Sequence, residues 1–235
     1  MLLTALLGLL AGAVTTHAGL GGGLVLTLAL AALHDPMTSL AIAGVGLLVG
    51  NLHRSWMYRS RIVVKTAVPY VLGAVPGALI GGLVAAVAPE RLVRGSMLVA
   101  AALATAKVLF AMRWTVPPGA MLPGGAAVGF VSATSGGGGL LAGPLLLGTG
   151  LTGRTYVATG SVGAASVHVA RLAGYGAGGA VDSGVLASGA LLALTIPLGN
   201  LAGERLRRIT PPAWTPRVEV GVVVAALLLA TAGFR

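Results

Sequence analysis

Eight long apolar stretches follow one another along this chain of 235 residues and determine its class. They cover residues 1–33, 36–53, 63–87, 91–112, 119–150, 154–173, 183–203 and 218–234. A helix needs about 20 predominantly apolar residues to cross the roughly 30 Å hydrocarbon core of a bilayer. Only 9% of the residues are charged, against roughly 25% in a typical soluble domain. The sequence therefore predicts an all-α polytopic membrane protein, because a membrane β-barrel would show short segments of alternating hydrophobicity.

The basic residues lie almost entirely between the apolar stretches, although the net charge is +10. Lys and Arg in such positions orient a membrane protein, so we expect no nucleic-acid partner. The absence of cysteine excludes disulfides and thiol chemistry. Four scattered histidines, of which only His34 has an acidic neighbour, predict no metal site. Residues 1–18 resemble the core of a signal peptide but lack a basic leader, so we interpret them as mature structure. We expect no cofactor and no catalytic residue.

Two glycine runs, GLGGG at 19–23 and SGGGG at 135–139, lie inside the first and fifth apolar stretches. Each glycine within a helix costs about 0.5–1 kcal/mol relative to alanine, and both stretches are too long for one simple span. We therefore expect each run to break its helix into two arms that form a re-entrant hairpin. A helix that dips only slightly and still crosses the bilayer is the alternative.

The chain also shows an internal repeat at a nearly constant spacing. An offset of 117 places Gly12 on Gly129, and His53 matches His168 at an offset of 115. The segments VPGALIGG (75–82) and ERL (90–92) return as IPLGNLAG (196–203) and ERL (204–206). Matches in the same order indicate a duplication. It predicts a first membrane repeat at 1–112, a linker at 113–118 and a second membrane repeat at 119–235, joined in one membrane domain.

The positive charges distinguish the two topologies. If both glycine-broken segments cross the bilayer, the Lys and Arg residues outside the helices divide equally between the two sides. If both are re-entrant, one side collects Arg54, Arg59, Arg61, Lys65, Arg113, Arg154, Arg205, Arg207, Arg208 and Arg217, against four on the other. We therefore predict three transmembrane helices and one re-entrant hairpin per half, with the second repeat inverted. This places a multi-pass chain in the inner (cytoplasmic) membrane with both termini outside.

The two glycine turns are the predicted site. Irregular backbone at membrane depth is buried in protein or lines a water-filled cavity, and successive glycine N–H groups bind anions. We expect the turns to meet near the midplane and bind a small anion, with hydroxyls such as those of Thr15 and Ser132 as further donors. The substrate-binding candidates are Thr16, His17, Gly19, Gly21, Gly22, Gly23, Thr134, Ser135, Gly136, Gly137, Gly138 and Gly139. Close helix packing is the alternative role for any single glycine.

A second group of polar residues within the apolar stretches is a candidate for the transport path or for ion coupling. It consists of Asn51, His53, Lys107, Ser161, His168 and Arg171. Ser161, His168 and Arg171 share one helical face by their spacing, which favours His168 over His53. The ordinary alternatives are an interfacial position for the histidines, snorkelling for Lys107 and a helix–helix hydrogen bond for Asn51.

The segments GLGGGLVLTLAL, GFVSATSGGGGLLAGPLLL, DPMTSLAIAG and VPGALIGG resemble the sulfite exporter TauE/SafE family, over almost the entire chain. The resemblance implies a duplicated secondary transporter or permease for sulfur oxyanions or organosulfonates, such as sulfite, sulfoacetate or thiosulfate. It also implies that both glycine runs occupy the family motif. Two features depart from the family pattern: no proline follows the first turn, whereas Pro144 follows the second, and the chain lacks the cysteines of thiosulfate importers. The second departure argues against thiosulfate.

Two other functions compete with a carrier that works by alternating access. A passive anion channel on the same scaffold is the first, and an intramembrane serine hydrolase built on Ser135 and His168 is the second. The sequence ATSGG around Ser135 lacks the G-x-S-x-G elbow, which argues against the hydrolase. We expect a small anion and membrane lipid as partners, while coupling to a proton or cation and assembly into a homo-oligomer are both open alternatives.

Overall fold

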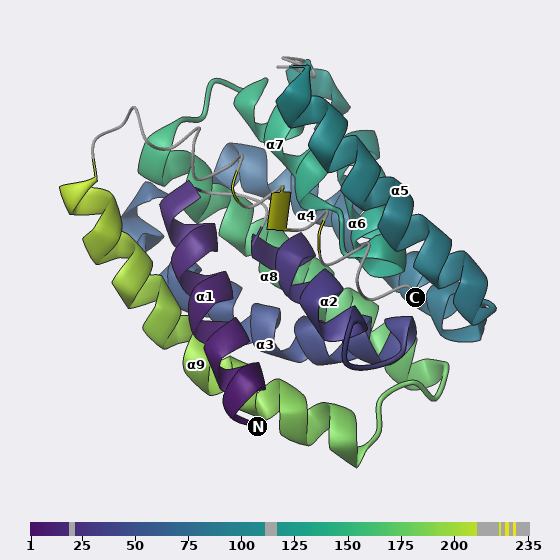
Figure 1. Ribbon diagram of the computed structural model, residues 1–235. Helices are drawn as coiled ribbons and strands as arrows, with labels where there is room; N and C mark the ends of the chain where they lie inside the picture. The colour runs from purple at the N-terminus through teal and green to yellow at the C-terminus, as the bar shows by residue number, and fades with distance from the viewer. Residues whose placement is uncertain (19–21, 111–116, 211–220, 222–223, 226–227, 229–235) are drawn as a thin grey trace.

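The computed structural model describes residues 1–18, 22–110 and 117–210, together with residues 221, 224, 225 and 228 (Figure 1). Within these residues the chain is helical and contains no strand. The elements are α1 (Leu2–Ala18), α2 (Gly22–Ala31), α3 (Pro36–Met57), η1 (Arg59–Arg61), α4 (Val64–Val87), α5 (Glu90–Leu109), η2 (Pro118–Ala120), α6 (Met121–Ser135), α7 (Gly139–Leu147), α8 (Gly153–Ala177) and α9 (Ser183–Ile209). Most of the predicted linker at 113–118 and of the predicted last span at 218–234 lies outside the described residues.

Three helices in the described part, α3, α4 and α9, are long and apolar enough to cross a bilayer by length and composition. Helices α5 and α8, with 20 and 25 residues, are of similar length but are not among these three. The predicted stretches 36–53, 63–87 and 183–203 begin at or next to the first residues of α3, α4 and α9. The all-helical class is therefore confirmed, and the apolar helices are those of a membrane protein.

Local sequence fixes where two of these long helices begin. Asp35 is the N-cap of α3: its carboxylate accepts a hydrogen bond from the Thr38 amide at 2.9 Å, and Pro36 occupies the first helical turn. Asp182 caps α9 in the same way, with a hydrogen bond of 2.7 Å from the Val185 amide. Such caps satisfy amides that have no partner inside the helix.

The second glycine run breaks its helix, as predicted, and the described residues on either side of the first run belong to two separate helices. Helix α1 ends at Ala18 and α2 begins at Gly22, and residues 19–21 between them lie outside the described part. In the second run, α6 ends at Ser135 and α7 begins at Gly139. Gly136 closes α6 in the left-handed conformation, with φ of 73°, which only glycine adopts without strain. The second arms, of 10 and 9 residues, are each only about 14–15 Å long.

Two helix pairs pack with their backbones in contact. Helix α1 runs along α9, and α6 runs along α4 (Figure 1). A Cβ placed on Gly12 would lie 2.2 Å from the Ile196 carbonyl oxygen, and one on Gly129 would lie 2.1 Å from that of Ala74. Only glycine allows helices to approach this closely. Gly12 and Gly129, which are related by the predicted offset of 117, therefore have the same packing role.

The main contacts join helices from before the linker with helices from after it. Besides the two pairs above, α3 packs on α8 and α9, and α4 packs on α8. Helix α5 lies against α6 on the outside of the molecule (Figure 1).

One of the matches used to infer the repeat, the ERL segment, joins residues that occupy different positions in the fold. Glu90 of the first ERL segment lies at the start of α5 and forms an exposed ion pair with Arg94. Glu204 of the second ERL segment is buried within α9. The two segments therefore occupy different positions in their helices, and the ERL match was a wrong correspondence.

Candidate functional site

A cavity of about 220 Å³ lies between the two broken helices and α3, α4, α5 and α8. Gly23 lines it from the first broken segment, and Gly136 to Gly139 line it from the second. The polar side chains in its wall belong to Thr15, Asn51, Arg54, Tyr70, Lys107, Ser132, Tyr156, Ser161, His168 and Arg171. The rest of the wall is mainly aliphatic. Among the described residues, no Asp or Glu lines the cavity.

Two of the cations in this wall are buried arginines. Arg54 is 5% exposed and Arg171 is 1% exposed. Arg54 donates from Nη2 to the side-chain oxygen of Asn51, one turn earlier on α3. Arg171 donates from Nη1 to the Ser132 carbonyl at 3.0 Å. Arg54 Nε and both Nε and Nη2 of Arg171 have no hydrogen-bond partner. Burying a cation without a counter-charge is costly, and the described residues of this wall supply no counter-charge.

The carbonyls of the last turn of α6 accept hydrogen bonds from side chains of two other helices. Arg171 takes the Ser132 carbonyl, the Tyr175 hydroxyl donates to Ala133, and the Ser96 hydroxyl donates to Thr134 at 2.7 Å. The last carbonyls of a helix have no partner inside it, and a cation near them is further stabilised by the helix dipole. The glycine break is thus fixed in place by α8 and α5, with Arg171 between the break and the cavity.

The arginines occupy related positions in the two halves. The segment N-x-x-R-x-x-x-Y spans Asn51 to Tyr58 at the end of α3, and H-x-x-R-x-x-x-Y spans His168 to Tyr175 on α8. The offset of 117 relates each polar residue of one segment to one of the other. The alignment of His53 with His168 places Arg54 among the loop charges, whereas the structure buries Arg54 in α3. The spaced Arg and Tyr were the signal that could have found it.

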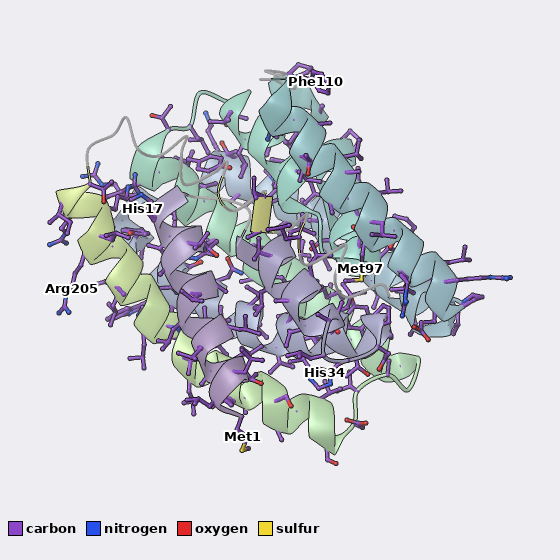
Figure 2. The ribbon with its side chains drawn as sticks, in the orientation of Figure 1. Met1, His17, His34, Met97, Phe110 and Arg205 are labelled. Atoms are coloured by element: carbon purple, nitrogen blue, oxygen red, sulfur yellow. The ribbon has the colours of Figure 1, made fainter. Side chains whose placement is uncertain are left out.

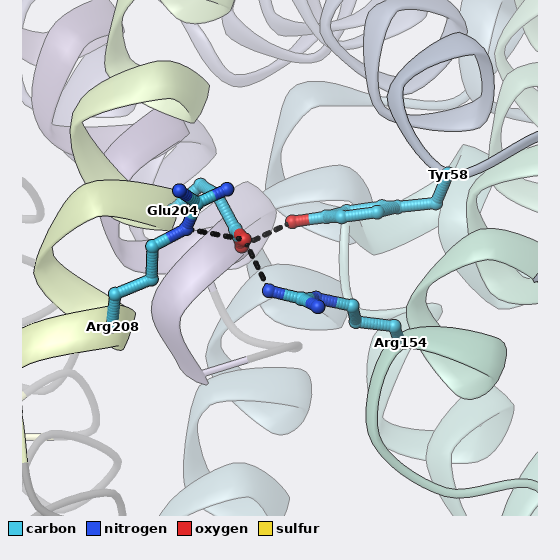
Figure 3. Close-up of polar contacts among 4 residues, drawn as sticks. All are labelled: Tyr58, Arg154, Glu204 and Arg208. Atoms are coloured by element: carbon cyan, nitrogen blue, oxygen red, sulfur yellow. Dashed lines mark hydrogen bonds and ion pairs between the residues drawn. The ribbon is translucent and has the colours of Figure 1, made fainter.

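A buried carboxylate organises the end of the molecule near Arg54 (Figure 3). Glu204 accepts hydrogen bonds from the Tyr58 hydroxyl at 2.6 Å and from Arg154 at 2.7 Å, and Arg208 contacts it at 3.3 Å. Burial, together with the hydrogen bond to Glu204, raises the pKa of Tyr58 to about 12, so the hydroxyl stays protonated at neutral pH. These contacts join the C-terminal end of α3, the start of α8 and the last turns of α9.

Comparison with known proteins now places the chain. A model of the sulfite exporter TauE/SafE family matches residues 4–233. The chain belongs to the TauE/SafE family. Its members are membrane transporters of sulfur anions, which is consistent with the absence of an enzymatic role. Nothing among curated proteins or solved structures matches the chain.

The structure divides the predicted turn residues of this TauE/SafE chain into three groups. Gly23 and Gly136 to Gly139 line the cavity. Gly22 instead packs against α1, since a Cβ there would lie 2.0 Å from Thr15 Oγ1. Gly19 and Gly21 lie outside the described residues. Lining a cavity is compatible with the predicted role in substrate binding, which stays a prediction.

Most of the expected hydroxyl donors already have acceptors in the TauE/SafE fold. Thr16 donates to Asn200 at 3.0 Å, and Thr134 and Ser135 donate to carbonyls of their own helix. Thr134 and Ser135 line a second, largely aliphatic cavity against α5. Thr15 likewise donates within α1, to Ala11. These hydroxyls are therefore less available to an anion than the sequence suggested, because threonine and serine readily donate to a carbonyl one turn back.

Two of the four glycine amides at the second turn are taken up by the protein. The Gly136 amide donates to the Ser132 carbonyl at 3.1 Å, and the Gly137 amide donates to Ser135 Oγ at 3.2 Å. In the described structure, the amides of Gly138 and Gly139 have no such acceptor. The predicted anion-binding nest is therefore smaller than the glycine count implied.

The polar candidates in the apolar stretches also separate. Asn51, Ser161, His168, Arg171 and Lys107 line the cavity, and Lys107 lines the second cavity as well. His53 does not line it: this half-buried ring stacks on Trp56, and its Nδ1 lies 3.3 Å from the Asn200 side-chain nitrogen.

His17 and Ser135 do not join the main cavity either. His17 is buried on the last turn of α1 (Figure 2), with neither ring nitrogen hydrogen-bonded. Ser135 donates to Val131 at 2.7 Å and lines a different cavity from His168. A Ser135–His168 pair is therefore not assembled for hydrolysis, which would need the base within hydrogen-bond reach of the hydroxyl.

Proposed function

We propose that the chain is a secondary transporter that moves a small anion, a sulfur oxyanion or an organosulfonate, across the cytoplasmic membrane by alternating access. One observation carries the proposal. A cavity at the second glycine break contains two buried arginines and, within the described residues, no carboxylate. In a medium of low polarity, an anion entering this cavity replaces its hydration shell with guanidinium groups and with the amides of Gly138 and Gly139.

The Glu204 cluster supports the re-entrant topology. With two re-entrant hairpins, the end of α3, the start of α8 and the end of α9 all face the same side of the membrane. With two full crossings, Tyr58 and Arg154 would face opposite sides. The hydrogen bonds of Tyr58 and Arg154 to the same carboxylate favour the first arrangement. The short second arms of the hairpins, each about half of a bilayer core in length, favour it as well.

The inverted repeat supplies the movement in this proposal. Each half contributes a glycine break, an arginine and a long helix to the cavity wall. Because the α1–α9 and α4–α6 pairs join the two halves through backbone contacts, the helices whose shift changes which end of the cavity is open are those that pack through side chains. The cavity itself keeps its two guanidinium groups during such a shift. His168 and Lys107 are the side chains in the wall that could couple a proton to the anion.

Reconstitution into liposomes tests the proposal. We expect saturable flux of sulfite and of sulfoacetate. Each anion should inhibit the flux of the other. Single-channel conductance in a planar bilayer would support the passive channel instead, and a folded protein that passes neither anion would contradict the proposal.

A matched pair of glycine variants tests the role of the break. A Cβ on Gly138 would lie 2.5 Å from that of Ser132, so Gly138→Val forces the two arms apart and should abolish flux. A Cβ on Gly23 would lie 3.4 Å from Leu47, an ordinary contact, so Gly23→Ala should keep flux near the wild-type level.

A further inference from the structure

A second cavity, of about 330 Å³, lies between α5 and the two arms of the second broken helix, α6 and α7. Its wall is mainly aliphatic, with Leu103 on α5 and Leu140 and Leu141 on α7 among the lining residues. Lys107 and Leu140 also line the cavity of the proposed transport site, so the two spaces adjoin. The proposed function gives this second cavity no role.

The hydroxyl groups in its wall already donate within the protein. Ser96 donates to the Thr134 carbonyl at 2.7 Å. Thr134 in turn donates to Phe130 at 3.0 Å, and Ser135 donates to Val131 at 2.7 Å. A water molecule in a buried site needs two to four polar partners, and this wall presents mainly hydrocarbon. An apolar ligand therefore suits the cavity better than water does.

The cavity follows one face of α5. The lining residues of this helix recur at 96, 99, 100, 103, 106 and 107, which is the three- and four-residue spacing of a single helical face. From Ser96 to Lys107 this face is about 16 Å long, at a rise of about 1.5 Å per residue. One leaflet contributes about 15 Å to a hydrocarbon core of roughly 30 Å. The cavity therefore has the length of one acyl chain of a membrane lipid.

In the described structure the cavity is open toward the surface along α5. Val99 and Leu103 line it, and each is 59% exposed. Ala100, on the other flank of the same face, is 3% exposed. Helix α5 lies on the outside of the molecule (Figure 1), and an exposed apolar surface of this kind marks a contact with membrane. A chain that enters beside Val99 and Leu103 reaches the buried part of the wall.

Lys107 places a positive charge at one end of this space. It is the one charged side chain that lines the second cavity among the described residues, and it lies in the last turn of α5. A lysine near the end of a membrane helix extends toward the level of the lipid headgroups, where basic residues attract anionic phospholipids. The charge and the aliphatic wall thus match the two parts of one lipid molecule.

From these observations we propose that the second cavity binds one acyl chain of an anionic phospholipid, with the headgroup at Lys107. The lipid comes from the leaflet that faces the C-terminal end of α5. The bound chain fills the space between α5 and α6, and the phosphate makes a charge-assisted contact with Lys107. This inference goes beyond the proposed function, because it depends neither on the transported anion nor on its movement.

Native mass spectrometry of the purified, delipidated full-length protein in detergent tests the proposal. The lipids are phosphatidylglycerol and phosphatidylcholine with the same two oleoyl chains. One phosphatidylglycerol should bind about fivefold more tightly than phosphatidylcholine, since a lysine beside an anionic headgroup contributes about that factor. Free oleate should displace it only in large excess, because the second chain of the phospholipid buries further apolar surface. Glycerol 3-phosphate, which has no acyl chain, should not displace it.

Two matched pairs of variants locate the bound lipid. Ala106→Trp fills the cavity and should weaken the binding of both phospholipids by about tenfold or more. Ala102→Trp, at an exposed residue one turn earlier that does not line the cavity, should leave binding unchanged. Lys107→Gln should bring the ratio of the two affinities to near one. Arg91→Gln, at an exposed residue near the other end of α5, should preserve this ratio.

The contrary outcomes are distinct. Equal affinity of the wild-type protein for the two phospholipids would overturn the role of Lys107, and displacement by oleate at equal concentration would replace the phospholipid with a free fatty acid. Unchanged binding in Ala106→Trp would place the lipid outside the cavity. A protein that retains no lipid would overturn the proposal and leave the cavity to another segment of the chain. The flux of sulfite in liposomes tests the proposed function separately.

Discussion

The segments that carry the two buried arginines have the same sequence pattern but different anchors. On α8, Tyr175 donates to the backbone carbonyl of Ala133, and Arg171 donates to that of Ser132. On α3, Tyr58 donates to the carboxylate of Glu204, and Arg54 donates to the side chain of Asn51. Both segments place a guanidinium in the cavity wall. The cation is therefore the feature that both segments share, whereas the contacts that hold it differ between them.

Removing each guanidinium should have the largest effects on transport, and the effects on stability should differ between the two segments. Arg54→Leu and Arg171→Leu are both expected to reduce anion flux in liposomes by about a hundredfold or more, since a buried charge-assisted contact is lost. Arg54→Leu should also lower stability, by about 1–3 kcal/mol, because the buried Asn51 side-chain oxygen loses its donor. Arg171→Leu should lower it less, because the Ser132 carbonyl keeps the hydrogen bond from the Gly136 amide. Thermal unfolding in detergent measures this second effect. Equal destabilisation by both variants would contradict the difference in anchoring.

Neutralising the carboxylate on the α3 side should come next. Glu204→Gln is expected to destabilise the protein by about 2–3 kcal/mol, because Tyr58 and Arg154 lose a charged, buried acceptor. The matched control is Glu90→Gln, which removes only an exposed pair with Arg94 and should change stability by no more than about 0.5 kcal/mol. Unfolding midpoints of the two variants in the same detergent compare them. Similar unfolding midpoints would show that the contacts of Glu204 do not stabilise the protein.

The two tyrosines allow a direct comparison of the anchors. Tyr58→Phe should cost about 1.5–3 kcal/mol, since its acceptor is charged, and Tyr175→Phe should cost about 1 kcal/mol, since its acceptor is a neutral carbonyl. In the Glu204→Gln background, the effect of Tyr58→Phe should shrink, because the two residues share one interaction. If the destabilisations caused by the two substitutions simply add in this double-mutant cycle, Tyr58 and Glu204 do not interact.

The smallest expected effect is at Gly44 of α3, which faces Arg171. A Cβ there would lie 3.3 Å from both Nε and Nη2 of Arg171 and 3.0 Å from Leu172 Cδ2. Gly44→Ala should therefore displace the guanidinium slightly and weaken sulfoacetate binding by about two- to fivefold. Calorimetry measures the affinity. An unchanged affinity would mean that the position of Arg171 tolerates this shift.

The sequence predicted those parts of the fold that depend on local pattern. Apolar length predicted where α3, α4 and α9 begin and where α4 ends, whereas α3 and α9 continue past the predicted ends at 53 and 203 to Met57 and Ile209. The second glycine run predicted the break between α6 and α7. These features were accessible because hydropathy and backbone freedom act over a few neighbouring residues.

The chemistry of the cavity was less accessible, because it depends on which helix faces which. Arg54 reads as a loop charge until α3 is seen to continue to Met57 and to bury it. The match of His53 with His168 followed residue identity, whereas the offset of 117 relates His168 to Asn51, and both of these line the cavity. Thr16 reads as a free hydroxyl until Asn200 of α9 is found beside it.

The glycine contacts between α1 and α9 and between α4 and α6 have a mechanical consequence. A Cβ on Gly199 would lie 2.2 Å from the Leu9 carbonyl oxygen, and a Cβ on Gly77 would lie 2.1 Å from the Ala126 carbonyl oxygen. The glycines at these contacts have no side chain that could change its rotamer. Sliding one helix along the other by one residue would therefore drive a methyl group into a carbonyl oxygen. Each of these pairs therefore resists shear, so any large displacement in this protein has to occur along softer boundaries, where side chains can re-pack.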